Sequence, residues 1–392
     1  MLDTPTYPTW PFVSDAEIDA ATRVLRSGRV NYWTGGEGRA FETEFAAAVG
    51  SRHAIALTNG TAALELALTA LGVGPGDDVV VPSRTFIASA SAVVTRGARP
   101  VMADVDRDSG NLTAATLEAA LTPRTRAVIV VHLAGWPVDM EAILAVARRH
   151  DLEVIEDCAQ SLGALVGGRH AGTFGRVGAF SFCQDKIITT AGEGGMVVTD
   201  DTALYERMWA FKDHGKSFDA VYRREHPPGF RWLHESFGTN FRMTEVQSAM
   251  GRVALAGLHD NLATRRRNAE TLLPYLAASP GLRVPTPPAG LTHAWYKLYA
   301  YVRPERLAAG WDRSRIQAVL EAEGVPVRQG SSSEIYLERA FDAPDLRPAE
   351  RLPVARELGD TSLMFLVHPT LEASHMHQIG AAVARVMAEA AP

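Results

Sequence analysis

The chain has 392 residues, of which 46% are hydrophobic and 21% are charged, so it is long enough to bury a large core and a smaller second one. Its formal net charge of −6 comes from interleaved acidic and basic residues, which excludes a basic stripe for binding nucleic acid or an anionic membrane. Two cysteines without CxxC spacing, and no apolar run long enough to span a bilayer, predict a cytoplasmic protein with small-molecule partners.

Strand-like apolar runs alternate with helix-like segments through the N-terminal half. A helix is expected over residues 14–28, because Ser14 and Glu17 have capping-box spacing and Gly28 ends the pattern. The strands expected after it are residues 53–59, 77–83, 99–106, 127–133, 152–158, 178–182 and 195–200, and the helices between them are 60–72, 86–97, 113–121 and 139–150. This alternation predicts an α/β protein with a mostly parallel sheet that is covered by helices on both faces.

A long helical pattern and a turn-rich boundary divide the rest of the chain. Residues 244–279 keep a helical period for longer than any earlier segment, which suits a bridge between domains. Proline and glycine are frequent in residues 280–290, and a strand over 295–302 and two helical stretches follow. The expected organisation is a large domain with the N-terminal segment, a long connecting helix and a smaller C-terminal domain, over residues 1–250, 251–280 and 281–392.

A single lysine stands among small and apolar residues in the stretch AFSFCQDKIITTAGEGGMVV, residues 179–198. Burying a lysine is costly unless its amine has chemistry to perform, which draws attention to Lys186. Asp157 stands at the end of the strand expected over residues 152–158, where open α/β sheets commonly place ligand-binding groups. The alternative for Glu156 and Asp157 is a solvated pair in a turn. Together, Lys186 and Asp157 place an amine and a carboxylate at one crevice.

An amine and a carboxylate in one crevice suit pyridoxal phosphate, whose aldehyde needs an amine and whose ring nitrogen needs an anion. The phosphate of this cofactor needs backbone amides, and Gly60 and Thr61 stand at the first turn of a helix that follows a strand. Ser181 is a second candidate phosphate donor, the alternative being an ordinary strand hydroxyl. These residues predict pyridoxal phosphate as the cofactor, and they indicate no metal site.

Five segments in a fixed order carry a family resemblance: NGTAALELAL, PSRTFIASASAV, IEDCAQSLGA, SFCQDKIITTAGEGGMVV and GTNFRMTEVQSAMGR. From about residue 10 to the C-terminus, the chain resembles the DegT/StrS group of sugar-nucleotide aminotransferases, which are fold type I pyridoxal phosphate enzymes. The resemblance implies a large domain with a mostly parallel, mixed sheet sandwiched by helices. It also implies a smaller α+β C-terminal domain.

The resemblance implies a role for each matching residue. Lys186 would bind the cofactor covalently and act as general base and acid, with Asp157 on the ring nitrogen and Gln160 near the phenolic oxygen. Phe86 would stack on the ring. The cofactor phosphate would be bound by Gly60, Thr61 and Ser181, and also by Asn240 of the neighbouring subunit. The resemblance therefore implies a homodimer with shared active sites.

The implied reaction transfers an amino group from L-glutamate to a nucleotide-linked keto-deoxysugar, with a 4-keto-6-deoxyhexose favoured. The product would be an aminosugar nucleotide for polysaccharide or natural-product glycosylation. One alternative is a pyridoxal-phosphate-binding regulator without turnover. Another is a sugar dehydratase of the same family, which Lys186 disfavours because those relatives carry histidine at this position. A Rossmann dehydrogenase is excluded, since no GxGxxG follows the first strand.

Three regions depart from the family pattern and are expected to shape the sugar pocket. Residues 325–341 lack a Pro-Leu-His stretch that many relatives carry, and Trp136 and the aromatic segment around Trp33 are unusual. Each tryptophan is either a ligand contact or core packing. Candidate contacts to the diphosphate, each with surface charge as the alternative, are Arg29, Arg231, Arg242 and Arg328.

Overall fold

The large domain is built on a seven-stranded sheet in the order β1-β9-β8-β5-β4-β2-β3. The structure is a computed structural model that describes residues 7–343 and 345–391. The strands of this sheet are β1 (His53–Leu57), β2 (Asp78–Pro82), β3 (Arg99–Ala103), β4 (Thr125–Val131), β5 (Glu153–Asp157), β8 (Val177–Ser181) and β9 (Gly195–Thr199). Strand β9 is antiparallel to both of its neighbours, and the other pairs are parallel. The expected α/β architecture with a mostly parallel, mixed sheet is confirmed.

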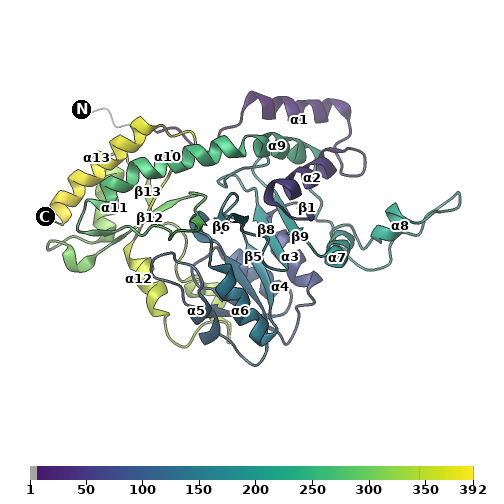
Figure 1. The fold of residues 1–392 in the computed structure, drawn as a ribbon, viewed down its shortest axis with the longest axis horizontal. Coiled ribbons are helices and arrows are strands. Elements are labelled where there is room, and N and C mark those ends of the chain that lie inside the picture. The colour runs from purple at the N-terminus through teal and green to yellow at the C-terminus, as the bar shows by residue number, and fades with distance from the viewer. Residues whose placement is uncertain (1–6, 344, 392) are drawn as a thin grey trace.

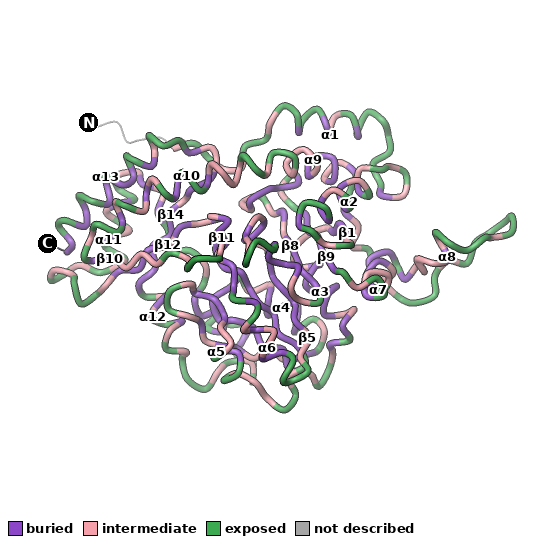
Figure 2. The backbone as a smooth tube through the Cα atoms, viewed as in Figure 1, coloured by how far each residue is buried: buried purple, intermediate pink, exposed green. Residues whose placement is uncertain are grey.

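Both faces of this sheet are buried, because its central strands are apolar at consecutive positions. Side chains alternate between the faces: Val79 and Val81 of β2 join one core cluster, and Val80 joins another. The first cluster is covered by α3 (Gly60–Ala70), α4 (Ala88–Thr95) and α7 (Thr202–Lys212). The second is covered by α5 (Ala114–Ala119) and α6 (Met140–His150). Figure 2 shows the buried strands running between the more exposed helices.

Two helices precede the sheet in the chain. Helix α1 (Asp15–Ser27) begins with the expected capping box between Ser14 and Glu17 and ends at Gly28, whose φ of 69° is left-handed. Helix α2 (Glu37–Val49) covers the β1 end of the sheet with a third core cluster, which includes Phe41 and Phe45. No helix was expected over this second segment.

The long helical pattern is two helices rather than the single one expected. Helix α9 (Glu245–Ala256) ends at Gly257, and α10 (Leu258–Ala277) begins immediately after it. Glycine has a low helix propensity, and here it separates two segments that pack on different partners. Helix α9 packs against α1 and α2, whereas α10 packs along α13 (Ala373–Ala390) of the C-terminal domain. Figure 1 shows α9 beside the helices of the large domain and α10 beside α13.

The C-terminal domain has its own core around a four-stranded antiparallel sheet in the order β10-β12-β14-β13. Its strands are β10 (Leu282–Arg283), β12 (Leu298–Val302), β13 (Val327–Arg328) and β14 (Ser362–Phe365). Its other elements are the helices α11 (Arg313–Ala322) and α12 (Pro353–Thr361) and the 3-10 turns η2 (Pro304–Arg306), η3 (Ile335–Leu337) and η4 (Arg339–Asp342). Helices α10, α11 and α13 supply apolar residues to the same core, which makes this domain α+β.

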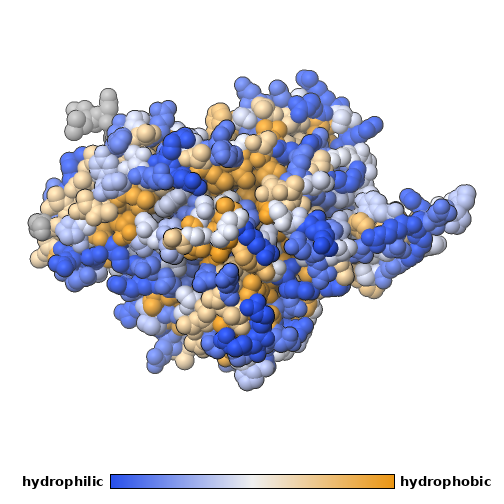
Figure 3. Space-filling view, in the orientation of Figure 1, coloured by the Kyte–Doolittle hydropathy of each residue, from blue (hydrophilic) through white to orange (hydrophobic). Residues whose placement is uncertain are grey.

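Two smaller features complete the fold. A three-stranded sheet in the order β11-β6-β7 joins the domains, with β6 (Leu165–Val166), β7 (Arg169–His170) and β11 (Leu291–Thr292). Residues 213–240, called the arm below, contain α8 (Phe218–Tyr222) and project away from the body of the large domain (Figure 1). The surface of the arm on the face drawn in Figure 3 is mostly hydrophilic. Among the described residues, no helix is long and apolar enough to cross a membrane.

Candidate active site

Two adjoining cavities open where β4, β5 and β8 end. The inner cavity has a volume of about 690 Å³, and its lining residues include Asn59, Gly60, Thr61, Phe86, Asp157, Gln160, Ser181 and Lys186. The outer cavity, of about 720 Å³, shares Phe86, Gln160 and Lys186 with the inner one and extends to residues of the C-terminal domain. Ligands of open α/β sheets bind at the carboxyl ends of the strands, and these cavities occupy that place.

Asp157 is a buried carboxylate at the end of β5. Its Oδ2 accepts a hydrogen bond from the Ser89 hydroxyl at 2.9 Å, and its Oδ1 accepts one from the backbone N–H of Ala159 at 3.1 Å. Burial raises the pKa of Asp157, and these hydrogen bonds and the charge of Lys186 do not cancel that effect. A buried carboxylate beside a cavity fits a cationic ring nitrogen. The alternative of a solvated pair is wrong, because Glu156 and Asp157 are both buried.

The N-terminus of α3 borders the same cavity. Asn59 caps the helix by accepting a hydrogen bond from Ala62 at 2.9 Å, and the first two amides, of Gly60 and Thr61, have no acceptor within the helix. The Ser181 hydroxyl accepts from Cys183 at 3.3 Å and keeps its own proton to donate. A Cβ at position 60 would lie 2.7 Å from the Ser181 Cβ, so this approach requires glycine. The arrangement suits a phosphate.

Gly194 and Gly195 follow the turn that contains Lys186, and no larger residue fits at either position. A Cβ at Gly195 would collide with the carbonyl oxygen of Asn59, and a Cβ at Gly194 would collide with the Thr190 hydroxyl. Strand β9 can therefore begin directly beside the turn that leads into α3. The glycine motif thus brings the lysine turn and the amides of α3 to one cavity.

Lys186 is held in a turn after β8. Its backbone N–H donates to the Cys183 carbonyl at 3.0 Å, and its carbonyl accepts from the indole N–H of Trp10 at 3.0 Å. The side chain is only 17% exposed, and Nζ lies 3.7 Å from an oxygen of Asp185 and 5.1 Å from the centroid of the Tyr296 ring. Because Lys186 lines both cavities, its amine can serve a group in either one.

Gln160 and Phe86 complete the wall between the two cavities. The Gln160 carbonyl oxygen accepts from the backbone N–H of Ala134 at 2.7 Å, which leaves its amide hydrogens free to donate to a ligand. The Phe86 side chain lines both cavities although it is 67% exposed. An aromatic ring that is exposed at a cavity wall can stack on a planar ligand.

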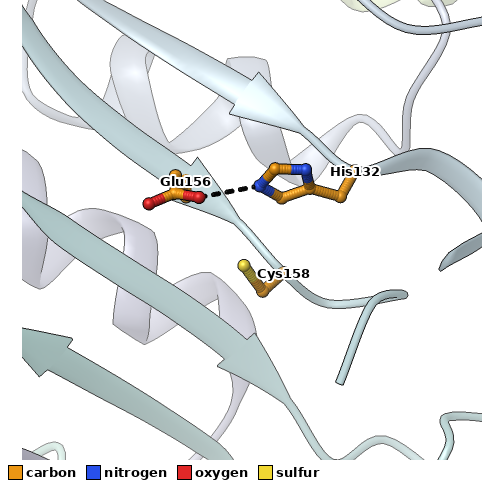
Figure 4. A group of neighbouring side chains, drawn as sticks. All are labelled: His132, Glu156 and Cys158. Atoms are coloured by element: carbon orange, nitrogen blue, oxygen red, sulfur yellow. Dashed lines mark hydrogen bonds and ion pairs between the residues drawn. The ribbon is translucent and has the colours of Figure 1, made fainter. Parts of the chain in front are cut away.

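Behind Asp157, on the other face of β5, lies a buried group of His132, Glu156 and Cys158 (Figure 4). Glu156 accepts hydrogen bonds from His132 Nε2 at 2.9 Å and from the backbone N–H groups of Gly172, Phe174 and Gly175. Burial raises the pKa of Glu156, but these donors outweigh it and bring the pKa below its usual value. His132 Nδ1 accepts from Val138, so Nε2 carries the proton. The hydrogen bonds indicate that Glu156 joins two loops, the one that follows β4 and the one between β7 and β8.

Two candidate sugar contacts lie differently from the expectation. Trp136 lines neither cavity; its ring packs edge-on against His293 with centroids 5.8 Å apart, and Asn111 donates to its carbonyl. Arg328 does line the outer cavity, where its guanidinium also pairs with Glu321 at 2.8 Å. Trp136 thus has a packing contact and no place in the lining of either cavity, and the expected substrate roles of Trp136 and Arg328 both stay predictions.

The remaining predicted residues are not among those that line the two cavities of their own chain. Arg242 pairs with the buried Asp213 at 2.8 Å. Trp33 packs edge-on against Trp209 with centroids 5.9 Å apart. The exposed residues that line neither cavity are Arg29, Arg231 and Asn240. Arg231 and Asn240 belong to the arm, and their expected contacts to substrate and cofactor stay predictions.

Several residues at the site were not expected from the sequence. Ser89 orients Asp157, Trp10 holds the backbone of Lys186, and the Tyr296 hydroxyl donates to Asp185. Lys297 lines the outer cavity beside them. The segment that holds Tyr296 and Lys297 was predicted as a strand, and no spacing signal links that strand to a lysine more than a hundred residues earlier.

Comparison with known proteins identifies the family. A profile of the DegT/DnrJ/EryC1/StrS aminotransferase family matches residues 12–384. The chain belongs to this family. A crystal structure of an aminotransferase from Psychrobacter cryohalolentis is 53% identical, with a TM-score of 0.96 over 98% of this chain and 99% of that chain. This aminotransferase therefore has the fold type I architecture expected from the sequence.

Two curated relatives of this aminotransferase have names that specify their substrates. The dTDP-3-amino-3,4,6-trideoxy-alpha-D-glucose transaminase of Streptomyces venezuelae is 39% identical and aligns with 91% of this chain and 88% of its own length. The UDP-N-acetyl-3-dehydro-alpha-D-glucosamine 3-aminotransferase of Acidithiobacillus ferrooxidans is 36% identical, over 90% and 89% respectively. Both are named for reactions at a sugar that is carried on a nucleotide.

Proposed function

We propose that this aminotransferase uses pyridoxal phosphate to move an amino group from L-glutamate to a keto-deoxysugar carried on a nucleotide. The observation that supports this most directly is the inner cavity, which is lined by the buried carboxylate of Asp157, the amine of Lys186 and the free amides of α3. An amine, an anion and a phosphate site are the three features that pyridoxal phosphate requires.

The bound cofactor would supply an electron sink for the carbon that carries the amino group. Asp157 would keep the ring nitrogen protonated, and Phe86 would cover the ring. Gly60, Thr61 and Ser181 would bind the phosphate, and Gln160 would donate to the phenolic oxygen. Lys186 would bind the aldehyde covalently and, once released by the donor, would move the proton to and from the substrate carbon.

The outer cavity supports a substrate larger than an amino acid. It runs from Lys186 to Arg328 and to the Ser331 and Ser332 loop of the C-terminal domain, so a sugar can reach the amine while an anionic group reaches a guanidinium. We carry forward a 4-keto-6-deoxyhexose as the first sugar to test. The names of both curated relatives specify position 3, so 3-keto sugars are its direct competitors.

Turnover of a nucleotide-linked keto sugar tests this function. Incubation of the loaded enzyme with glutamate and a panel of dTDP-, UDP- and GDP-linked 3-keto and 4-keto sugars is expected to give equal amounts of one aminosugar nucleotide and 2-oxoglutarate. Mass spectrometry of the sugar and an enzymatic assay for 2-oxoglutarate measure the two products. If glutamate is consumed but no keto sugar is aminated, transamination holds and the sugar assignment fails.

The same assay separates the two other functions considered for this chain. A regulator without turnover would bind the cofactor and release no 2-oxoglutarate beyond one equivalent. A sugar dehydratase would give a deoxygenated product that contains no new nitrogen. Lys186 favours the aminotransferase, because it supplies a base that can return a proton to the substrate carbon.

We also propose that two copies of the chain form a homodimer through the arm. Phe230, Trp232 and Phe237 of the arm are 79%, 82% and 100% exposed, which is unusual for large aromatic side chains of a chain that stays alone. Asn240 ends this arm and is exposed, so it is available to the cofactor phosphate of a neighbouring copy. An isologous pair would bury both arms at once.

Mixed dimers are expected to recover activity if the sites are shared. Lys186→Ala and Asn240→Ala are each expected to be nearly inactive, but a hybrid dimer would contain one site without either substitution. Equal mixing with subunit exchange should restore about a quarter of the wild-type activity, since half of the dimers are hybrids with one intact site each. Activity is measured before and after exchange, with each mutant exchanged against itself as the control. A fully active monomer at low concentration contradicts shared sites.

A further inference from the structure

Lys297 is fixed at the outer cavity, between the two domains. It directly precedes β12, and its backbone N–H donates to the carbonyl of Ala134 at 3.2 Å. The N–H of Ala134 in turn donates to the side chain of Gln160 at 2.7 Å. The backbone of Lys297 is thus connected to the wall of the inner cavity, while its side chain lines the outer cavity together with Lys186 and Tyr296.

The ammonium group of Lys297 has no counterion of its own among the described residues. Within residues 7–343 and 345–391, no acceptor lies at hydrogen-bond or ion-pair distance from Nζ, which sits 4.7 Å from the centroid of the Tyr296 ring. Asp185 is the acid that influences it, but Asp185 already accepts from the Tyr296 hydroxyl and lies 3.7 Å from Lys186 Nζ. An ammonium in this position is available to an anionic ligand.

The surroundings of Lys297 carry more positive than negative charge. Burial, with the charges of Arg265 and Lys186, lowers the pKa of Lys297 to about 8, although Asp185 acts in the opposite direction. Arg265 is almost fully buried below Tyr296, and its Nη1 donates to the carbonyl of Tyr296 at 3.3 Å. A bound carboxylate would offset this local excess of positive charge.

The position of Lys297 relative to Lys186 determines which anionic group of a substrate it can contact. Both ammonium groups lie against the ring of Tyr296, at 4.7 and 5.1 Å from its centroid. In an amino acid the α-carboxylate is bonded to the carbon that carries the reacting nitrogen, so it must lie close to Lys186. In a sugar nucleotide the diphosphate is attached to the anomeric carbon, and the sugar ring separates it from the ketone.

We propose that Lys297 binds a carboxylate of the amino donor. This inference rests on the proposed aminotransferase function and adds a residue for the first half of the reaction. Arg328, which lines the outer cavity together with Lys186 and Lys297, has a side chain that is 62% exposed and pairs with Glu321, which places it closer to solvent. The two cations would then serve different substrates: Lys297 the amino acid, and Arg328 the sugar nucleotide.

Binding of a dicarboxylate that cannot react tests the assignment directly. Calorimetry with glutarate and the pyridoxal-phosphate-loaded enzyme is expected to show about 10- to 100-fold weaker binding for Lys297→Gln, since a charge-assisted hydrogen bond is lost. Lys297→Arg keeps the charge and should retain most of the affinity. In single turnovers with glutamate, Lys297→Gln should raise the donor concentration needed for half-maximal rate by a similar factor.

Arg328→Gln is the matched control, because it removes a cation of the same cavity that is not assigned to the amino donor. It should leave glutarate affinity within about twofold and raise KM for the sugar nucleotide instead. The cofactor spectrum and the unfolding temperature of each variant report folding. If Lys297→Gln does not retain the cofactor, Lys297→Met, which keeps a longer aliphatic stem, replaces it.

The pH dependence gives a readout that a merely structural lysine would not change. Only the ammonium form binds an anion, so glutarate affinity should be full below pH 8 and fall as the pH rises through about 8. The charged groups that act on Lys297 are Asp185, Lys186 and Arg265, and the nearby His368 is neutral at this pH because burial and the adjacent cations lower its pKa to about 3. The other groups are unchanged in Lys297→Arg. Any decrease in glutarate affinity with rising pH that persists in this variant is therefore caused by those groups.

The outcomes separate this inference from the proposed function. If the wild-type enzyme converts no amino donor, the proposed function fails. If the wild type converts glutamate and Lys297→Gln binds glutarate equally well, the function holds and the assignment of Lys297 is overturned. Selective weakening of the sugar nucleotide by Lys297→Gln also overturns it, because the lysine would then serve the diphosphate.

Discussion

Borohydride reduction of the pyridoxal-phosphate-loaded protein is expected to fix the cofactor on the peptide that contains Lys186. The reason is geometric: Lys186 is the lysine that lines the inner cavity, together with the carboxylate of Asp157 and the amides of α3. Its backbone is held on both sides, by Cys183 and by Trp10, so the side chain starts from a fixed point. Peptide mass spectrometry after proteolysis identifies the labelled residue.

Substitution of this lysine should have the largest effect of any single change in the chain. Lys186→Arg keeps the positive charge but cannot form the covalent bond, and Lys186→Ala removes both. Each is expected to lower turnover by at least about 10³-fold, since nucleophile and proton carrier are lost together. Both variants should still bind the cofactor through the phosphate and Asp157. Labelling of Lys297, the other lysine close to this site, would overturn the assignment.

Much of the fold was predictable because local patterns and burial agree in the large domain. The strands of the seven-stranded sheet are apolar at consecutive positions, and each expected strand lies within a few residues of the observed one. The capping box of α1 contains both of its hydrogen bonds. Local signals of this kind need only residues a few positions apart, so a single sequence contains them.

The errors have identifiable physical causes. Helical periodicity continues across Gly257, but the two halves pack on different domains, which periodicity alone cannot reveal. The core positions of α2 are filled by Phe41 and Phe45, separated by small and charged residues, so no run of apolar residues marked it. The ring of Trp136 packs on His293, a residue far away in the sequence, and a single sequence does not indicate such a contact.

The residues of the candidate site also include some that the sequence indicates and others that it does not. Lys186, Asp157 and Gly60 come from strand ends and turns that the sequence marks, and the structure brings them to one cavity. Their roles toward a cofactor stay predictions. Tyr296 and Lys297 approach Lys186 only because the C-terminal domain folds back onto the large one, through backbone contacts to the loop at Ala134. Contacts between domains leave no periodic or motif signal in one sequence.

Replacement of Asp157 by asparagine is expected to slow the reaction by about 10²- to 10⁴-fold, with cofactor binding affected less. This range corresponds to about 3–5 kcal/mol, the usual effect of removing one partner from a buried charged pair. Asparagine keeps the size of the side chain but not its charge. One of its two terminal atoms becomes a donor, which faces the donors Ser89 and Ala159 that now serve the carboxylate.

Ser89→Ala is the matched control for this substitution. It removes one hydrogen bond to Oδ2 and leaves the negative charge in place, so its effect on turnover should be about 10-fold, as for one hydrogen bond to a charged group. Rates of the glutamate half-reaction, followed by the cofactor absorbance, measure both variants. Near-normal turnover in Asp157→Asn would show that another group holds the ring nitrogen.

The free energy of unfolding of the cofactor-free protein gives a second test of Asp157→Asn. In this test the substitution is not expected to be harmful, whereas it is expected to slow the reaction. Burial raises the pKa of Asp157 in the folded chain, so the folded state holds this proton more tightly than the unfolded state does. The contribution of Asp157 to stability is therefore present at low pH and is lost as the pH rises through the raised pKa. At neutral pH the cofactor-free variant should be as stable as the wild type or more stable, and the loaded variant less stable. Denaturant unfolding with and without pyridoxal phosphate measures this reversal, and a variant that is less stable in both forms would contradict a raised pKa of Asp157 in the folded chain.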